Sequence, residues 1–269
     1  MMTLEAQWIF SFLLLGAFVG FMAGLLGIGG GGIMVPVLTT LFLYQGIPVE
    51  NVVHLALGTS MASIIITSIS SLRAHHSEGA VIWSIVKIMS PGIVSGSFMA
   101  TFIAVKISSF YLTIFFSLFI VYVAIQMFLN KKPKAGRELA GTGGLLLAGS
   151  GIGAISALVS IGGGSLTVPY LVWQNVDIKK AIGTSAAMGL PISVAGTAGY
   201  VINGWSAISA VNYTLGFVYL PAVFLISMTS FLTAPYGARL AHRMPVASLK
   251  KAFALLLIIL CAKMLYSVI

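Results

Sequence analysis

Apolar residues in this sequence run in long stretches that are separated by short polar connections. Three of the runs, Trp8–Leu26, Ile107–Leu129 and Val211–Leu232, approach or exceed the roughly 20 residues that a membrane-spanning helix needs. The pattern predicts ten apolar elements, five in each half of the chain. They cover residues 7–27, 30–45, 51–72, 80–105, 108–129, 141–160, 163–175, 180–202, 208–232 and 246–268.

The composition narrows the class of protein. Of the 269 residues, 59% are hydrophobic and 7% are charged, which leaves too little polar surface to cover a soluble globule. The basic residues behind the net charge of +9 lie in the connections, where they specify membrane topology and do not indicate a nucleic-acid partner. One cysteine, Cys261, excludes an internal disulfide framework. We therefore expect an all-α polytopic protein in a lipid bilayer, with no metal and no cofactor.

The chain contains an internal repeat. Residues Gly16–Leu38 align with Gly149–Leu171 at a constant offset of 133, and Ala56–Ala62 aligns with Ala181–Ala187 at an offset of 125. This predicts a first transmembrane repeat at 1–130, a linker at 131–139 and a second repeat at 140–269. An odd number of elements per repeat inverts the second copy, which is the inverted-repeat architecture of secondary transporters, with about ten transmembrane elements and broken helices.

The distribution of charge predicts the orientation. If the linker is cytoplasmic and all ten elements cross, eleven basic residues fall inside and two fall outside, as the positive-inside rule requires. Both termini are then external, and the first apolar run is expected to be a retained helix. The alternative is that the two short glycine-led elements re-enter the membrane. The element at 163–175 is too short to span alone as a straight helix.

Glycines suggest two different roles. Small residues four apart, such as Gly16 with Gly20 and Gly149 with Gly153, are typical of helix-packing faces. The denser runs around Gly29–Gly31 and Gly162–Gly164 predict helix breaks, with a restart just before Pro36 and Pro169. The N–H groups and the positive dipole end of the new helix would favour a bound anion. Close helix crossing without a ligand is the alternative.

Hydroxyl groups recur beside these breaks. Thr59 and Ser60 in the first copy, and Thr184 and Ser185 in the second, follow a glycine and could donate to a bound oxyanion. Hydroxyls in apolar helices also bond back to their own backbone, so this alternative stays open. Ser165 joins the expected site from the second glycine run.

The positions of the charged residues indicate whether the transported substrate is an anion or a cation. All five acidic residues lie in the N-terminal tail or in connections, whereas cation and proton transporters usually keep a carboxylate inside the membrane. A small anionic substrate is therefore expected. Arg73, His75 and His76 could guard an entrance, although a topology signal explains them equally. We expect His54 to be interfacial.

The sequence resembles the sulfite exporter TauE/SafE family, also called the TSUP family of membrane anion transporters. The resemblance covers nearly the whole chain and is carried by GIGGGGIMVP (27–36) and SIGGGSLTVP (160–169), each followed by GTS. It implies export of sulfite, an organosulfonate or a related sulfur-containing organic anion across a prokaryotic cytoplasmic (inner) membrane, without an enzymatic step. Serines replace glycines at Ser160 and Ser165, so the two sites need not be equivalent.

Other functions fit the same architecture. An anion channel or an importer is the main alternative. A membrane-embedded enzyme or assembly factor is less favoured, because the chain has no HExxH, no mid-span acidic residue and no cysteine pair. Export needs no coupling ion, since an interior negative potential drives an anion outward by about 2.3 kcal/mol per charge per 100 mV. The oligomeric state is left open.

Overall fold

The computed structural model describes residues 5–26, 30–129, 136, 138–205, 212–241 and 246–268. Within these residues the chain forms ten helices and one two-stranded hairpin, so the expected all-α fold is confirmed. The elements are α1 (Ala6–Leu26), α2 (Gly31–Tyr44), α3 (Val49–Ser77), α4 (Trp83–Ala104), α5 (Ser109–Leu129), α6 (Thr142–Val159), α7 (Gly164–Trp173), α8 (Ile178–Gly204), β1 (Thr214–Leu215), β2 (Val218–Tyr219), α9 (Leu220–Ala241) and α10 (Val246–Val268).

Eight of the described helices are long and apolar enough to cross a membrane, and two are not. With 14 and 10 residues, α2 and α7 are about 21 and 15 Å long at a rise of 1.5 Å per residue. The hydrocarbon core of a bilayer is about 30 Å thick. Neither short helix can cross alone, and each follows one of the glycine runs.

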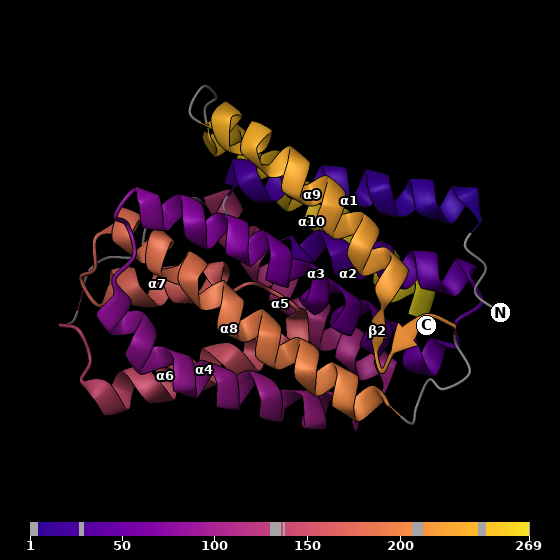
Figure 1. The fold of residues 1–269 in the computed structure, drawn as a ribbon, viewed down its shortest axis with the longest axis horizontal. Helices are drawn as coiled ribbons and strands as arrows, with labels where there is room; N and C mark the ends of the chain where they lie inside the picture. Colours follow the sequence, from indigo (N-terminus) through magenta and orange to yellow (C-terminus); the bar gives the residue numbers. More distant parts are fainter. Residues whose placement is uncertain are drawn as a thin grey trace.

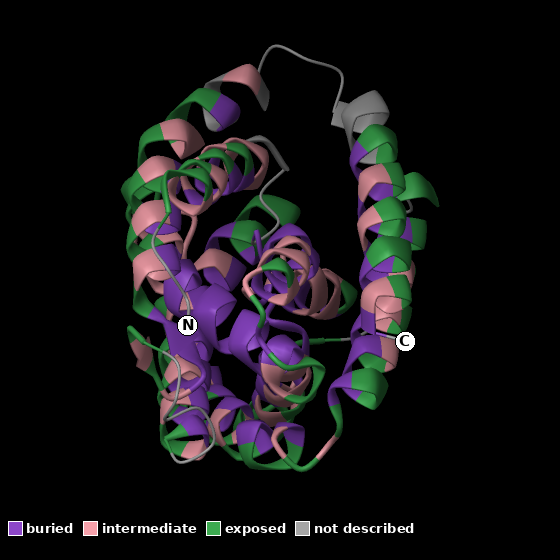
Figure 2. Ribbon diagram, turned by 90° about the vertical axis from the view of Figure 1, so that its right-hand side faces the viewer, coloured by how far each residue is buried: buried purple, intermediate pink, exposed green. Residues whose placement is uncertain are grey.

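The outer surface is apolar, as it is in a protein that faces lipid. Buried residues gather in the middle of the molecule and exposed ones follow the outer helices (Figure 2). Large hydrophobic side chains remain more than half exposed on several outer helices, which a water-soluble monomer rarely shows. Examples are Phe10, Leu14, Met99, Leu118, Phe128, Leu147, Phe224 and Ile259.

The main helix pairs join one half of the chain to the other. Helix α1 packs along α9, α4 along α6, α3 along α8 and α5 along α10. Figure 1 shows α1 with α9 on one side of the molecule and α4 with α6 on the other. Each helix of the first half has its counterpart five helices further along the chain, so that α1 corresponds to α6 and α4 to α9. Exchanging every helix for its counterpart gives the same set of pairs. The two halves are therefore interleaved and share one core.

Glycines allow two of these pairs to approach closely, as expected. A Cβ atom at Gly16 of α1 would lie only 2.5 Å from the carbonyl oxygen of Ile226 in α9, and one at Gly20 would overlap Ser230. No side chain larger than hydrogen fits there unless the helices separate. The same contact recurs between α4 and α6 at four glycines: Gly92, Gly96, Gly149 and Gly153.

Three connections meet at one end of the molecule. The Ala140 backbone N–H donates to the Gln174 side-chain oxygen at 3.1 Å, so the end of the linker lies beside the end of α7. The Lys180 ammonium donates to the Gly79 carbonyl at 2.7 Å, which adds the connection between α3 and α4. The charge pattern predicts that this end is cytoplasmic.

The start of α9 differs from the expectation. The apolar pattern predicted an element from 208, but the helix begins at Leu220, and residues 212–219 form a turn and the β1–β2 hairpin. The reason is local backbone geometry, because Tyr213 and Gly216 have φ values of 63° and 56°. A helix does not tolerate left-handed residues. This hairpin packs against α3.

Candidate functional site

The second glycine run breaks a helix, as predicted. Helix α6 ends at Val159, and Ser160 adopts a left-handed conformation with φ 50° and ψ 47°. Gly163, the residue before α7, also has a positive φ of 70°, which glycine adopts without strain. The Gly163 N–H donates to the Ile161 carbonyl at 2.9 Å and the Gly164 N–H to the Gly162 carbonyl at 2.7 Å. The turn is tight, and no side chain caps the start of α7.

The first glycine run lies only partly within the described residues. Helix α1 ends at Leu26 and α2 begins at Gly31, whereas Gly29 falls outside the described part of the chain. Gly30 and Gly31 are buried. Within the described residues, α1 therefore ends just before this run and α2 begins inside it.

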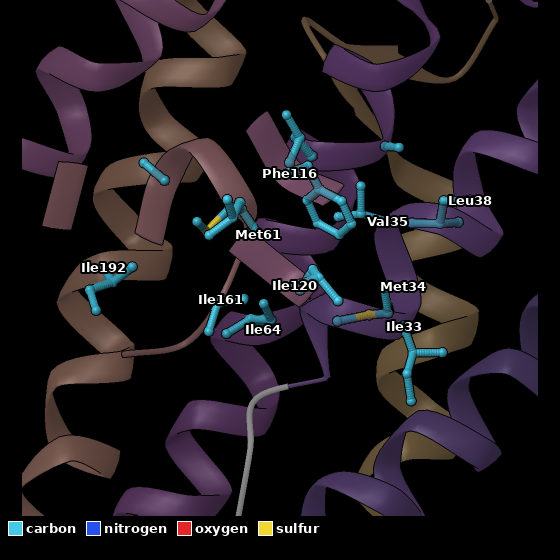
Figure 3. Packing of buried hydrophobic residues seen from close by; sticks show 14 of the residues in the cluster. Ile33, Met34, Val35, Leu38, Met61, Ile64, Phe116, Ile120, Ile161 and Ile192 are labelled. Atoms are coloured by element: carbon cyan, nitrogen blue, oxygen red, sulfur yellow. The ribbon is translucent and has the colours of Figure 1, made fainter. Parts of the chain in front are cut away.

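The two glycine runs meet inside the molecule. A Cβ atom at Gly31 would overlap the carbonyl group of Ser160 and would lie 3.4 Å from Cδ1 of Ile64 in α3. The Ser160 hydroxyl donates to the Leu57 carbonyl at 3.3 Å. In Figure 3, Ile161 of the second break lies next to Ile64. Gly31 is thus required for direct contact of the two breaks beside α3.

The second break also lies against the middle of α8. A Cβ atom at Gly163 would lie 3.0 Å from Cδ1 of Ile192 and 3.7 Å from the Ser185 carbonyl oxygen. A Cβ atom at Gly189 would lie 3.5 Å from the Gly162 carbonyl oxygen. The structure therefore brings Ser185 to the second glycine run, between α3 and α8.

Thr59 and Thr184 make matching contacts that the sequence did not reveal. The Thr59 hydroxyl oxygen accepts the Tyr219 backbone N–H at 3.0 Å, just before α9. The Thr184 hydroxyl oxygen accepts the Ile82 backbone N–H at 3.0 Å, just before α4. Both threonines are fully buried. Each holds the segment that leads into a long helix of the other half.

The glycine before each threonine explains the repeated Gly-Thr pair. A Cβ atom at Gly58 would overlap the carbonyl oxygen of Phe217, and one at Gly183 would overlap that of Ala80. In both copies the glycine makes room for a carbonyl, and the threonine accepts the N–H two residues further on. This role in docking is structural, and the hydroxyl protons of both threonines are still available to donate to a ligand.

Several buried hydroxyls next to the breaks have no hydrogen-bond partner among the described residues. Ser60 of α3 and Thr167 of α7 are fully buried, and their oxygens accept and donate nothing. The Ser165 hydroxyl, at the second residue of α7, is in the same state. Unsatisfied buried hydroxyls are costly. The sequence pointed to Ser60 and Ser165 but missed Thr167, which follows the glycine run instead of lying within it.

Both short helices begin before their proline, as expected. Pro36 is the sixth residue of α2 and Pro169 the sixth of α7, so each helix begins five residues before its proline and one residue after the start that the apolar pattern predicted. A proline in the second turn removes only one internal N–H.

The predicted cations lie at the end of α3. Arg73 and His76 are exposed and His75 is half-buried, all in the last turns of this helix. The His76 Nδ1 accepts the Trp83 indole N–H at 3.3 Å. Arg73 follows Ser68 by five residues, about 7.5 Å along the helix, and a Cβ atom at Gly189 would lie 2.9 Å from the Ser68 hydroxyl oxygen and 3.5 Å from the Gly162 carbonyl oxygen.

His54 is buried within the protein, in the second turn of α3. Only 4% of it is exposed, because its Nε2 donates to the last carbonyl of α4, at Ala104, over 3.0 Å. Its ring also packs against Phe217 at a centroid distance of 5.3 Å. In the described part of the chain, histidines, cysteine and acidic residues form no group that could hold a metal ion.

Comparison with known proteins agrees with this arrangement. The family described as "Sulfite exporter TauE/SafE" matches residues 12–264. A probable membrane transporter protein of Haemophilus influenzae is 38% identical, over 94% of this chain and 96% of its own length. The probable membrane transporter protein YdhB of Bacillus subtilis is 28% identical, over 88% and 92%. No solved structure matches the chain significantly.

These relatives are named as probable membrane transporters, and eight described helices of this chain are long and apolar enough to cross a membrane. The chain belongs to the TauE/SafE sulfite exporter family and is a multi-pass membrane transporter.

Proposed function

We propose that the chain exports sulfite, an organosulfonate or a related sulfur-containing organic anion across the cytoplasmic membrane of a prokaryote. The observation that carries this proposal is the set of buried, unpartnered hydroxyls around the second glycine break: Ser60, Ser165 and Thr167. Such groups are stable in a membrane protein when a ligand completes their hydrogen bonds. The family description supplies the class of anion.

The anion binds at the centre, between Gly29–Gly31 and Gly162–Ser165. Hydroxyls of Ser60 and Ser185 donate to it from α3 and α8, and Thr59 and Thr184 keep a proton to donate while they hold their backbone partners. The start of a helix adds a partial positive charge. Arg73, His75 and His76 lie at the entrance on the cytoplasmic side.

The proposed direction of transport and the negative charge of the substrate follow from the position of the acidic residues. Glu50 lies in the first turn of α3 and Glu78 follows its last residue. Asp177 caps α8, and Glu5 and Glu138 precede the first helix of their repeats. No described helix carries a carboxylate in its central turns that would bind a coupling cation. The membrane potential alone then drives the anion outward, by about 2.3 kcal/mol per charge per 100 mV.

Alternating access uses the two halves as inverted repeats. Two observations support this symmetry: the main helix pairs stay the same when the two halves are exchanged, and a matching Gly-Thr contact occurs in each half. The contact at Thr184 lies at the end of the molecule with the linker, and the contact at Thr59 lies toward the opposite end. The transporter opens toward one side or the other by moving one set of helices while the second stays closed.

The proposal is tested by sulfite efflux from proteoliposomes with an imposed potential. Replacing Gly30 or Gly163 by leucine should abolish efflux, because Val19 and Ile192 occupy the space that a side chain would need. Gly151→Leu is the matched control, since a side chain there meets no atom within 4 Å. Efflux at the wild-type rate in both site variants would remove the glycine breaks from the mechanism. Transport that requires a cation gradient would favour an importer.

A further inference from the structure

The two glycine breaks have different chemistry despite their common origin. At the offset of 133, four hydroxyl residues of the second copy replace residues without a hydroxyl in the first. The first-copy residues are Ala23, Gly27, Gly32 and Met34, and their counterparts are Ser156, Ser160, Ser165 and Thr167. The substitutions all surround the break, so the second break is polar and the first is apolar.

One pair of positions shows the difference directly. A Cβ atom at Gly30, just before α2, would lie 3.6 Å from the Met34 methyl carbon, whereas one at Gly163, just before α7, would lie 3.5 Å from the Thr167 hydroxyl oxygen. The two glycines and the two side chains are equivalent in the repeat, although the glycine backbones differ, with a φ of −64° at Gly30 and 70° at Gly163. Four residues after the glycine, the side chain carries a methyl group at one break and a hydroxyl at the other.

The surroundings of Gly30 and Gly32, in the described part of the first break, are also apolar. Beside Gly30 lies the Val19 side chain, and a Cβ atom at Gly32 would meet Ile120 and Leu257 at 3.2 and 3.4 Å. Figure 3 shows Met34 near Ile120. These hydrocarbon side chains provide no hydrogen-bond donor to a bound oxyanion.

The Thr167 hydroxyl points to a ligand. The residue is fully buried, its oxygen has no partner among the described residues, and it lies beside the residue that precedes α7. A threonine in a helix usually bonds back to a carbonyl of the preceding turn, as Thr39 does with Val35 in α2. Thr167 does not, although the Gly163 carbonyl lies in that turn.

We propose that the anion is held at one break only, by the start of α7 with the hydroxyls of Thr167 and Ser165, and that the α2 break serves as its apolar packing partner. This inference rests on the proposed function and deepens it, because it assigns one oxyanion site per chain and adds Thr167 as a binding residue. The positive end of the α7 dipole and two O–H donors fit a sulfite or sulfonate group.

The test is anion binding by the purified chain in detergent. Wild type is titrated with sulfite, sulfoacetate, taurine and sulfate, and the ligand that binds best is used for the variants. Thr167→Val removes the hydroxyl at almost constant volume and should weaken binding about tenfold or more. Thr167→Ser keeps the hydroxyl and should retain binding. Thr39→Val is the matched control, because it removes a buried hydroxyl that is bonded within its own helix.

Folding provides a second readout. Since the Thr167 hydroxyl has no partner in the described protein, Thr167→Val should leave the ligand-free thermal stability equal to that of wild type or raise it. Weaker binding with unchanged stability is therefore the expected result.

Two outcomes overturn the inference while the proposed function stands. In the first, wild type binds an anion and Thr167→Val binds it equally well. In the second, Thr167→Val and Thr39→Val weaken binding to the same extent. If wild type binds none of the anions, the proposed function itself fails, and the inference fails with it.

Discussion

Replacing Thr184 by valine tests the structural role of the repeated Gly-Thr pair. The hydroxyl oxygen of Thr184 accepts the Ile82 backbone N–H at 3.0 Å and is fully buried. Valine has nearly the same shape but no acceptor. The backbone N–H of Ile82 is then left without a partner, and the start of α4 loses this hydrogen bond to α8.

The expected loss follows from the desolvation of one backbone donor. A buried N–H that loses its acceptor costs about 1–3 kcal/mol. Thr184→Val should therefore lower the free energy of unfolding by that amount, and Thr59→Val should do the same through Tyr219. Thr184→Ser keeps the oxygen and should recover most of the loss.

The assay is unfolding of the purified variants in mixed micelles of increasing SDS content, followed by circular dichroism. Thr113→Val is the control, because Thr113 is also fully buried but only donates to Ser109 in its own helix. Its loss of stability should be smaller than that of Thr184→Val, because a hydroxyl that bonds back to its own helix contributes little to helix stability. The reasoning is refuted if Thr184→Val is as stable as Thr113→Val, or if Thr184→Ser is as unstable as Thr184→Val.

Two further predictions concern packing and orientation. Gly96→Ala places a Cβ atom onto the Ser150 carbonyl and should lower the free energy of unfolding by about 1–3 kcal/mol in the same assay. Gly151→Ala meets open space, so it should leave the free energy of unfolding unchanged or raise it by up to about 1 kcal/mol through helix propensity. Equal effects of the two variants would contradict the close contact of α4 with α6. In a Cys261→Ala background, a cysteine at Ser77 should react with an impermeant thiol reagent only from the cytoplasmic side and one at Tyr44 only from outside, and the reverse pattern would invert the proposed topology.

The apolar pattern was enough to predict the fold class. Long runs without charge can only be helices in a bilayer, and nine of the ten described helices overlap most of their expected ranges. The failure at α9 came from Tyr213 and Gly216. Hydropathy does not register positive φ angles, so the apolar run from Val211 concealed the β hairpin.

The candidate site was only partly visible in the sequence. The repeat located the glycine breaks, because glycine runs are rare in membrane helices and occur twice. It could not show that Thr59 and Thr184 each accept an N–H from the other half, since these partners are 160 and 102 residues away. It could not show the burial of His54 for the same reason, as that burial depends on Ala104 and Phe217.

Thr167 was missed although the repeat contained the signal. Positions that agree between the two copies carry the repeat, whereas Thr167 is informative because it differs from Met34. Only the structure shows that the Thr167 hydroxyl lies beside Gly163 without a hydrogen-bond partner among the described residues.

The most direct measurement is an experimental structure of the chain with sulfite or an organosulfonate bound. The account predicts density for the anion at the start of α7, within hydrogen-bond distance of the Thr167 and Ser165 hydroxyls and close to Gly163. Density at the α2 break, or only at the cytoplasmic end near Arg73 and His76, would contradict it.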